Sequence, residues 1–159
     1  MSKKIKLLHA ITHLPVGGAQ DNTLYTVELL DKVKYDISLC CNLNGELVSR
    51  AKKVKHLKLY DVPNLRREVS IINDIRAFLY LYKLIKKENF TIIHTHSSKA
   101  GFLARIAAML NKTPIVIHTI HGFAFHDYMN AFKKILFINL EKLSSKWTHR
   151  LITVSNLNK

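Results

Sequence analysis

Histidines gather in two short stretches of the sequence, and each stretch contains or directly follows an apolar, β-branched run. The first is "IIHTHSSK", residues 92–99, and the second is "HTIHGFAFHD", residues 118–127. An imidazole can ligate a metal ion or gain and lose a proton near neutral pH. The two stretches therefore raise two hypotheses, a metal site and a loop that contacts a ligand or takes part in catalysis.

A metal site is the weaker of these hypotheses. Alternation along a strand turns His94 and His96 to the same face, so they could share a metal ion. Zinc needs three or four ligands, and the others would have to come from His118, His121 or His126. In the second stretch, alternation places His118 and His121 on opposite faces. We therefore expect no metal, and strand-end histidines that bind the backbone, a neighbouring loop or a polar ligand.

The candidate catalytic residue is His121, which stands where the second apolar run gives way to a loop. Gly122 follows it and lets the chain turn sharply. An imidazole at this position can accept a proton from a substrate oxygen or donate a hydrogen bond to it. From the chemistry alone, a catalytic or ligand-binding role and a structural role both remain open.

Two other loops carry groups suited to phosphate. Gly17 and Gly18, in "HLPVGGAQDN", lead into a helical segment, whose free N–H groups favour an anion. The segment has neither a G-x-G-x-x-G pattern nor a Walker lysine, so a plain tight turn remains the alternative. Arg66 and Arg67, in "NLRREVS", present the forked donors that suit phosphate, although an ordinary exposed pair would look the same.

Short β-rich runs alternate with longer segments of helical period, which predicts a Rossmann-like parallel sheet of about six strands with helices on both faces. Ligands of such sheets bind beyond the carboxyl ends of the strands, where the loops described above lie. The helix over 70–87 shows one apolar face that includes Ile71, Ile75 and Ile85. We predict strands at 4–11, 35–41, 54–59, 90–95, 114–120 and 149–155, and helices at 19–32, 45–53, 70–87, 98–110 and 129–146.

The composition fits one globular domain with a strong positive charge. The 159 residues are 48% hydrophobic and carry a formal net charge of +14. This charge attracts nucleic acid, an anionic membrane or phosphate-bearing small molecules. No apolar run is long enough to span a membrane. The adjacent Cys40 and Cys41 suit reduced core residues better than a disulfide, which favours a cytoplasmic protein.

Five segments in this order give the sequence a familiar pattern: "GGAQ", "NLRREVS", "HTHSSKAGFLARIAA", "HTIHGFAFHD" and "HRLITVSN". Together they resemble the N-terminal half of family 4 glycosyltransferases, above all the bacterial group that acts on lipid-linked sugars of capsular or exopolysaccharides. The resemblance implies the GT-B architecture, in which two Rossmann-like domains face each other across a cleft. Such enzymes move a hexose from a nucleotide-sugar to an acceptor with retention of the anomeric configuration.

The resemblance also implies roles for particular residues. Gly17 and Gly18 would approach the donor diphosphate and sugar, and His121 would lie beside the reacting sugar as the catalytic residue. No metal and no other cofactor is expected. Contacts on the acceptor side would come from Arg66, Arg67, His96, Ser97 and Lys99.

The donor-binding domain of the family has no counterpart in residues 1–159, which we expect to form a single domain. That absent domain supplies a pair of glutamates, and Glu141 is a helix-face residue rather than a substitute. We therefore expect the chain to be inactive alone and to act as an acceptor-binding domain. The alternative is a non-catalytic, membrane-docking subunit of a two-chain transferase, with the donor domain on a separate chain.

The expected partners are a nucleotide-sugar donor, a lipid-linked sugar acceptor and an anionic membrane surface. The cations are spread over several helices, and the sequence contains no recognition helix or RNA-binding motif, so we expect no nucleic acid. A basic domain without a spanning helix suits docking to anionic headgroups. We therefore place the chain in the cytoplasm, peripheral on the inner face of the membrane.

Overall fold

The protein folds around a six-stranded sheet in which every strand runs parallel to its neighbours, in the order β3-β2-β1-β4-β5-β6. The computed structural model describes residues 4–122 and 130–155. This strand order is that of a doubly wound Rossmann-like fold, whose direction of winding reverses between β1 and β4. The strands are β1 (Ile5–His13), β2 (Tyr35–Asn42), β3 (Lys58–Asp61), β4 (Ile92–Thr95), β5 (Ile115–Ile120) and β6 (Arg150–Thr153).

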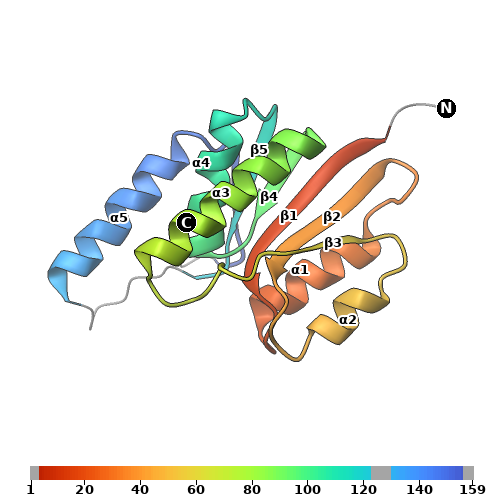
Figure 1. Cartoon of the computed structure of the whole chain (residues 1–159), viewed down its shortest axis with the longest axis horizontal. Coiled ribbons are helices and arrows are strands. Elements are labelled where there is room, and N and C mark those ends of the chain that lie inside the picture. Colours follow the sequence, from red (N-terminus) through yellow and green to blue (C-terminus); the bar gives the residue numbers. More distant parts are fainter. Residues whose placement is uncertain (1–3, 123–129, 156–159) are drawn as a thin grey trace.

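Helices cover both faces of the sheet, as the sequence predicts. The helices are α1 (Gly18–Leu29), α2 (Val48–Lys53), α3 (Ile71–Glu88), α4 (Ser98–Leu110) and α5 (Ala131–Ser145). One buried cluster joins α3 and α4 to the sheet and includes Leu81, Ile93 and Ala104. A second joins α1 and α2 to the other face and includes Leu24 and Leu39. Figure 1 shows α2 and α5 at opposite ends of the molecule.

Two predictions about individual elements need correction. The third strand was expected at 54–59 but begins at Lys58, because Val54 caps the end of α2 and the Leu57 N–H donates to the Val54 carbonyl in a turn. In α3 the buried positions begin at Ala77 and continue with Leu81, Leu84 and Ile85. The apolar residues of its first two turns lie outside the core, and Ile71 is 76% exposed.

The loop after β2 is fastened to the end of β1 at Gly45. Gly45 has a φ of 120°, and a Cβ there would lie 2.3 Å from the Leu14 carbonyl carbon and oxygen. The Leu14 N–H donates to the Asn44 carbonyl, and the Leu47 N–H donates to the Leu14 carbonyl. Only glycine fits this approach. It fixes the segment that carries the glycine pair before α1.

The two cysteines lie where their adjacency in an apolar segment predicts, in the core. Cys40 and Cys41 are free, buried thiols in β2, and burial raises the pKa of Cys41 to about 12, so both are inert core residues. Among the residues that the structure describes, no helix has the length and apolar character needed to cross a bilayer.

Candidate functional site

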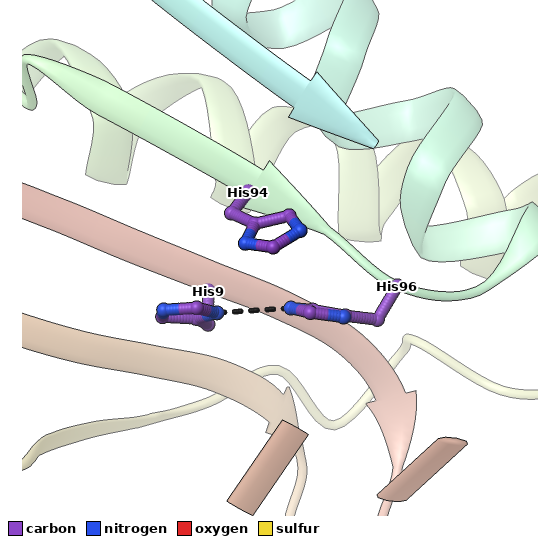
Figure 2. Close-up of side chains that lie close together, drawn as sticks. All are labelled: His9, His94 and His96. Carbon is purple, nitrogen blue, oxygen red and sulfur yellow. Dashed lines mark hydrogen bonds between the residues drawn. The ribbon is translucent and has the colours of Figure 1, made fainter. Parts of the chain in front are cut away.

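Three histidine rings meet at the carboxyl edge of the sheet, between β1 and the end of β4 (Figure 2). The parallel register places His9 of β1 beside His94 of β4. His96 follows β4, and its ring centroid lies 4.2 Å from that of His94. The Nδ1 atom of His9 lies 2.9 Å from Nε2 of His96, within hydrogen-bonding distance. The predicted proximity of His94 and His96 is therefore confirmed, and His9 joins them.

His121 extends this cluster toward the surface. Its Nε2 atom lies 3.4 Å from Nδ1 of His96, at the long end of the range for a hydrogen bond. His94 Nε2 lies 2.7 Å from the Thr119 hydroxyl. His118 points to the opposite face of the sheet, where its Nδ1 lies 2.7 Å from the Thr95 hydroxyl. The predicted separation of His118 from His121 is thus confirmed.

Burial keeps these imidazoles neutral. Loss of solvation, together with a smaller effect of a neighbouring imidazole, lowers the pKa of His9 to about 3 and that of His94 to about 4. The pKa of His96 lies well below its ordinary value for the same reasons. Burial also lowers the pKa of His121. Near neutral pH, each ring therefore offers one N–H and one lone pair.

His9, His94 and His96 could together hold a metal ion, because one ligand atom from each lies within 4.8 Å of the others. Within the described residues the third member is His9 rather than the expected His118 or His121, and the remaining candidate, His126, lies outside those residues. Two zinc-bound nitrogens in a tetrahedral site stand roughly 3.3 Å apart, given bonds of 2.0–2.1 Å. His9 and His96 are closer than this and contact each other directly. Our expectation of no metal remains a prediction.

The glycine pair lies at the start of α1. Gly17 is the N-cap residue, and no side chain of the described residues caps this end of the helix. A Cβ added at Gly18 would meet nothing within 4 Å. The first turn of α1 therefore presents backbone N–H groups at the carboxyl edge of the sheet, where an anion can approach closely.

The loop with Arg66 and Arg67 reaches the same edge. Both arginines are exposed, and the nearby charge of Arg67 adds to burial in lowering the pKa of His13, the last residue of β1. Lys99 of α4 holds this loop, because its Nζ donates to the Glu68 carbonyl and lies 2.8 Å from a carboxylate oxygen of Asp74.

Ser97 and His96 are already engaged within the protein. Ser97 precedes α4, but its hydroxyl accepts from the Thr12 N–H and contacts the Thr12 hydroxyl at 2.7 Å instead of capping the helix. His96 is 1% exposed, and both of its ring nitrogens face other imidazoles. Ser97 thus ties the end of β1 to α4, and His96 lies behind His121.

Comparison with known proteins identifies the family. The model of Glycosyltransferase Family 4 matches residues 16–159. This chain belongs to glycosyltransferase family 4. It is 40% identical over 156 residues to the UDP-Gal:alpha-D-GlcNAc-diphosphoundecaprenol alpha-1,3-galactosyltransferase of Escherichia coli, covering 98% of this chain and 40% of that enzyme. It is 26% identical to the capsular polysaccharide biosynthesis glycosyltransferase CapM of Staphylococcus aureus, over 96% of this chain and 38% of the relative.

Solved structures of low identity share the fold. Acinetobacter baumannii MurG matches with a TM-score of 0.70 at 11% identity, over 98% of this chain and 42% of MurG. Anabaena Alr3699/HepE, in complex with UDP and glucose, matches with a TM-score of 0.68 at 11% identity, over 92% of this chain and 37% of that protein. The fold is thus the Rossmann-like half of the GT-B architecture. The chain spans about two fifths of the length of these relatives.

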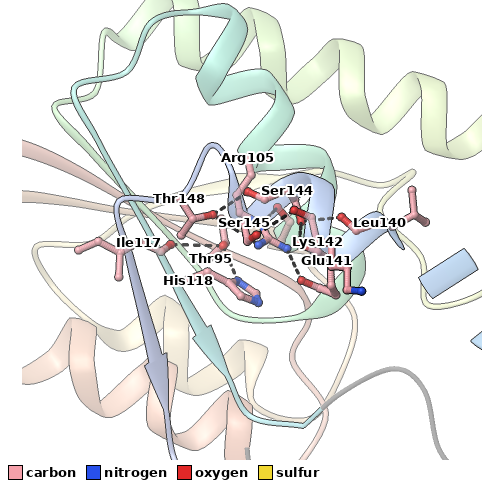
Figure 3. Close-up of polar contacts among 11 residues, drawn as sticks. Thr95, Arg105, Ile117, His118, Leu140, Glu141, Lys142, Ser144, Ser145 and Thr148 are labelled. Carbon is pink, nitrogen blue, oxygen red and sulfur yellow. Dashed lines mark hydrogen bonds and ion pairs between the residues drawn. The ribbon is translucent and has the colours of Figure 1, made fainter. Parts of the chain in front are cut away.

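Behind the sheet edge, the family 4 chain contains a buried ion pair (Figure 3). Arg105 of α4 is fully buried and lies 2.8 Å from a carboxylate oxygen of Glu141 on α5. Its Nε also donates to the Gly101 carbonyl. Glu141 was interpreted as a helix-face residue, and the structure shows that it is the charge partner of Arg105 and fastens α5 to α4.

Gly101 leaves room for the His118 ring in this same region. A Cβ at Gly101 would lie 2.7 Å from Cε1 of His118, which is itself held by Thr95. Gly101→Ala is therefore expected to displace the His118 ring and to lower the free energy of unfolding by about 1–3 kcal/mol, as overpacking of a core does. Urea denaturation measures this loss. Gly18→Ala, at a position with open space, is the matched control, and an equal effect of both variants would contradict the prediction.

His9 and Thr12 were not predicted as part of the site, although the sequence contains a signal for them. A doubly wound sheet places its first strand beside its fourth. That order, applied to "HAITH" and "IIHTHS", puts His9 beside His94 and Thr12 near Ser97. Arg105 gave no such signal, because its position within the helix alone does not tell whether it faces solvent.

Proposed function

We propose that this chain supplies the acceptor-binding half of a retaining glycosyltransferase that moves a hexose from a nucleotide-sugar to a lipid-linked glycan in polysaccharide biosynthesis. The observation that carries the proposal is the 40% identity, along 98% of the chain, to an enzyme named for a sugar-diphosphoundecaprenol acceptor. The donor-binding half and its glutamate pair would belong to a second domain.

We assign roles to the predicted residues at the open edge of the sheet. The backbone N–H groups after Gly17 and Gly18 would stabilise the charge that develops on the departing nucleotide diphosphate. His121, at the end of β5, would donate a hydrogen bond to the sugar. Neither role requires a metal ion. His96 is buried, so its contribution would pass through His121 rather than through direct contact with the acceptor.

Arg66 and Arg67 would hold the acceptor diphosphate. They are exposed, and their loop is fixed to α4 by Lys99, so their charges reach the ligand from a defined position. Guanidinium groups suit this task because their forked donors match phosphate oxygens.

The apolar start of α3 suits the lipid part of such an acceptor or the membrane that contains it. A groove of about 420 Å³ runs between α3 and α4 and is lined by Ile71, Ile75, Phe78 and Leu103, among others. Val69 and Ile72, next to it, are 74% and 65% exposed. Apolar side chains can insert into a membrane, and the neighbouring arginines are attracted to anionic headgroups. Both effects favour binding of this region to an anionic membrane.

Charge removal at the arginine loop tests this docking. Arg66→Gln with Arg67→Gln is expected to weaken binding to vesicles that contain anionic lipid by about 30-fold, at roughly 1 kcal/mol for each cation near the surface. Vesicle sedimentation measures the partition coefficient. The control variant, Lys52→Gln with Lys53→Gln, removes two positive charges from α2, which packs on the face of the sheet opposite to α3 and α4. It should change vesicle binding little. If both double variants weaken vesicle binding equally, the net charge of the protein, and not the position of the arginine loop, determines that binding.

A sugar-transfer assay tests whether the acceptor-binding and donor-binding halves are both needed for activity. The purified chain is offered a polyprenyl-diphosphate sugar and a panel of nucleotide-sugars, alone and then with the donor-binding half of the Escherichia coli relative. We expect no turnover alone, acceptor binding that is lost in the arginine double variant, and transfer only when both halves are present. Robust turnover by the 159-residue chain alone would defeat the proposed dependence, and absent acceptor binding would defeat the assigned role.

A further inference from the structure

Three imidazoles form a continuous chain from the core to the open edge of the sheet. His9 Nδ1 lies 2.9 Å from His96 Nε2, and His96 Nδ1 lies 3.4 Å from His121 Nε2. Both ring nitrogens of His96 therefore contact other histidines. The longer contact is of a kind that tightens when a ligand closes an active site.

Such a chain has only two arrangements of its hydrogen atoms. A neutral imidazole has one N–H and one lone pair, and each contact needs a donor and an acceptor. In one arrangement, His9 donates to His96 and His96 donates to His121. In the other, both hydrogen bonds are reversed, and His121 donates inward through Nε2.

The inner end of the chain decides between them. Nε2 of His9 is buried and has no hydrogen-bond partner among the described residues. In the inward arrangement this atom would carry an N–H without a partner. In the outward arrangement it carries only a lone pair. Orphaned N–H groups are rarer in protein interiors than under-satisfied acceptors, which favours the outward arrangement.

We propose that His9 and His96 are positioning residues that hold His121 as the tautomer with its hydrogen on Nδ1. The Nε2 atom of His121 then accepts from His96, and the nitrogen left for a ligand is a donor. A donor at this place suits a sugar hydroxyl or an oxygen that gains negative charge. The use of that donor rests on the proposed function, whereas the tautomer itself does not.

Long-range ¹H–¹⁵N correlation spectra of the ¹⁵N-histidine-labelled chain at neutral pH test the proposal directly, because protonated and unprotonated ring nitrogens have well-separated shifts. We expect protonated Nδ1 in His9, His96 and His121, with roughly tenfold preference at His121, as one buried hydrogen bond provides. A protonated Nε2 in His9 or as the main form in His121 would overturn it. The exposed His56 serves as an internal reference.

Two variants of His96 separate positioning from packing. His96→Asn keeps an amide donor near the place of Nδ1, which contacts His121, whereas His96→Leu has none. The tautomer preference of His121 should survive in the first and fall several-fold in the second, with the backbone amide spectrum confirming the fold. An unchanged preference in His96→Leu would overturn the proposal. If that variant does not fold, the wild-type spectrum alone decides.

A metal ion is the competing occupant, and zinc titration in the same spectra addresses it. Stoichiometric zinc-induced shifts at His9, His94 and His96 would overturn the proposal, because a bound ion would take the lone pairs that the imidazole chain uses. The absence of zinc-induced shifts at these residues would support the hydrogen-bonded chain of imidazoles. Neither outcome depends on sugar transfer, so the failure of this inference and the failure of the proposed function remain distinguishable.

Discussion

At pH 5 the free energy of unfolding is expected to be about 8 kcal/mol lower than at pH 7, because four buried histidines titrate only in the unfolded chain. Burial lowers the pKa of His9 and His118 to about 3 and that of His94 to about 4, and holds that of His96 well below its ordinary value. In the unfolded chain each histidine binds a proton near pH 6.5, which favours unfolding as the pH falls.

The sign follows from proton binding. Between pH 6.5 and pH 4 the unfolded state holds more protons than the folded state, so stability rises with pH in this window and is complete above it. Each buried histidine contributes about 2 kcal/mol to the loss at pH 5. Because the whole stability of a domain is about 5–15 kcal/mol, mild acid should unfold much of the protein.

Urea denaturation at several pH values from 7 to 5.5 measures this dependence. His94→Gln should reduce the slope of the unfolding free energy by about 0.8 kcal/mol per pH unit, averaged over this range, since it removes one of the four groups. His56→Gln changes an exposed histidine and should leave the slope as it is. A free energy that stays constant from pH 7 to pH 5.5 would show that these rings take up protons in the folded protein as readily as in the unfolded chain, and would contradict the prediction.

The sheet could be predicted from the sequence because its strands are short apolar runs separated by helices of clear period. The one strand predicted out of place, β3, is four residues long and follows a turn that begins with the apolar Val54 and ends with the apolar Leu57. Local pattern alone does not tell such a turn from a strand. Pairing with β2 determines which residues form the strand, and the sequence of β2 lies elsewhere in the chain.

The candidate site was predictable to the extent that it follows from strand ends. His94, His96 and His121 come directly after apolar runs, and parallel strands bring such residues to one edge. His9 was missed because it lies inside β1 rather than at its end. The exposure of Ile71 and Ile75 could not be predicted either, because helical period gives the apolar face but not how far the neighbouring elements extend along it.

Loss of the Glu141 carboxylate is the second large effect expected. Arg105 is fully buried, and Glu141 is the acidic side chain that the described residues place beside its guanidinium. Glu141→Ala would leave that charge buried without compensation, which typically costs about 3–5 kcal/mol of unfolding free energy. Asp36→Asn breaks the exposed pair with Lys58 and should cost less than about 1 kcal/mol.

A double variant separates the buried charge from mere packing. Arg105→Met with Glu141→Gln removes the charge together with its partner, and should be more stable than Glu141→Ala alone, because replacing both members of a buried pair is often close to neutral. Urea denaturation at pH 7.5, above the histidine titrations, compares the three variants. If Glu141→Ala costs no more than Asp36→Asn, the pair does not fasten α5. If it costs 3–5 kcal/mol, α5 is held to the α4 turn beside Gly101 and His118, and the carboxyl edge of the sheet is stabilised by a charge that lies entirely behind it.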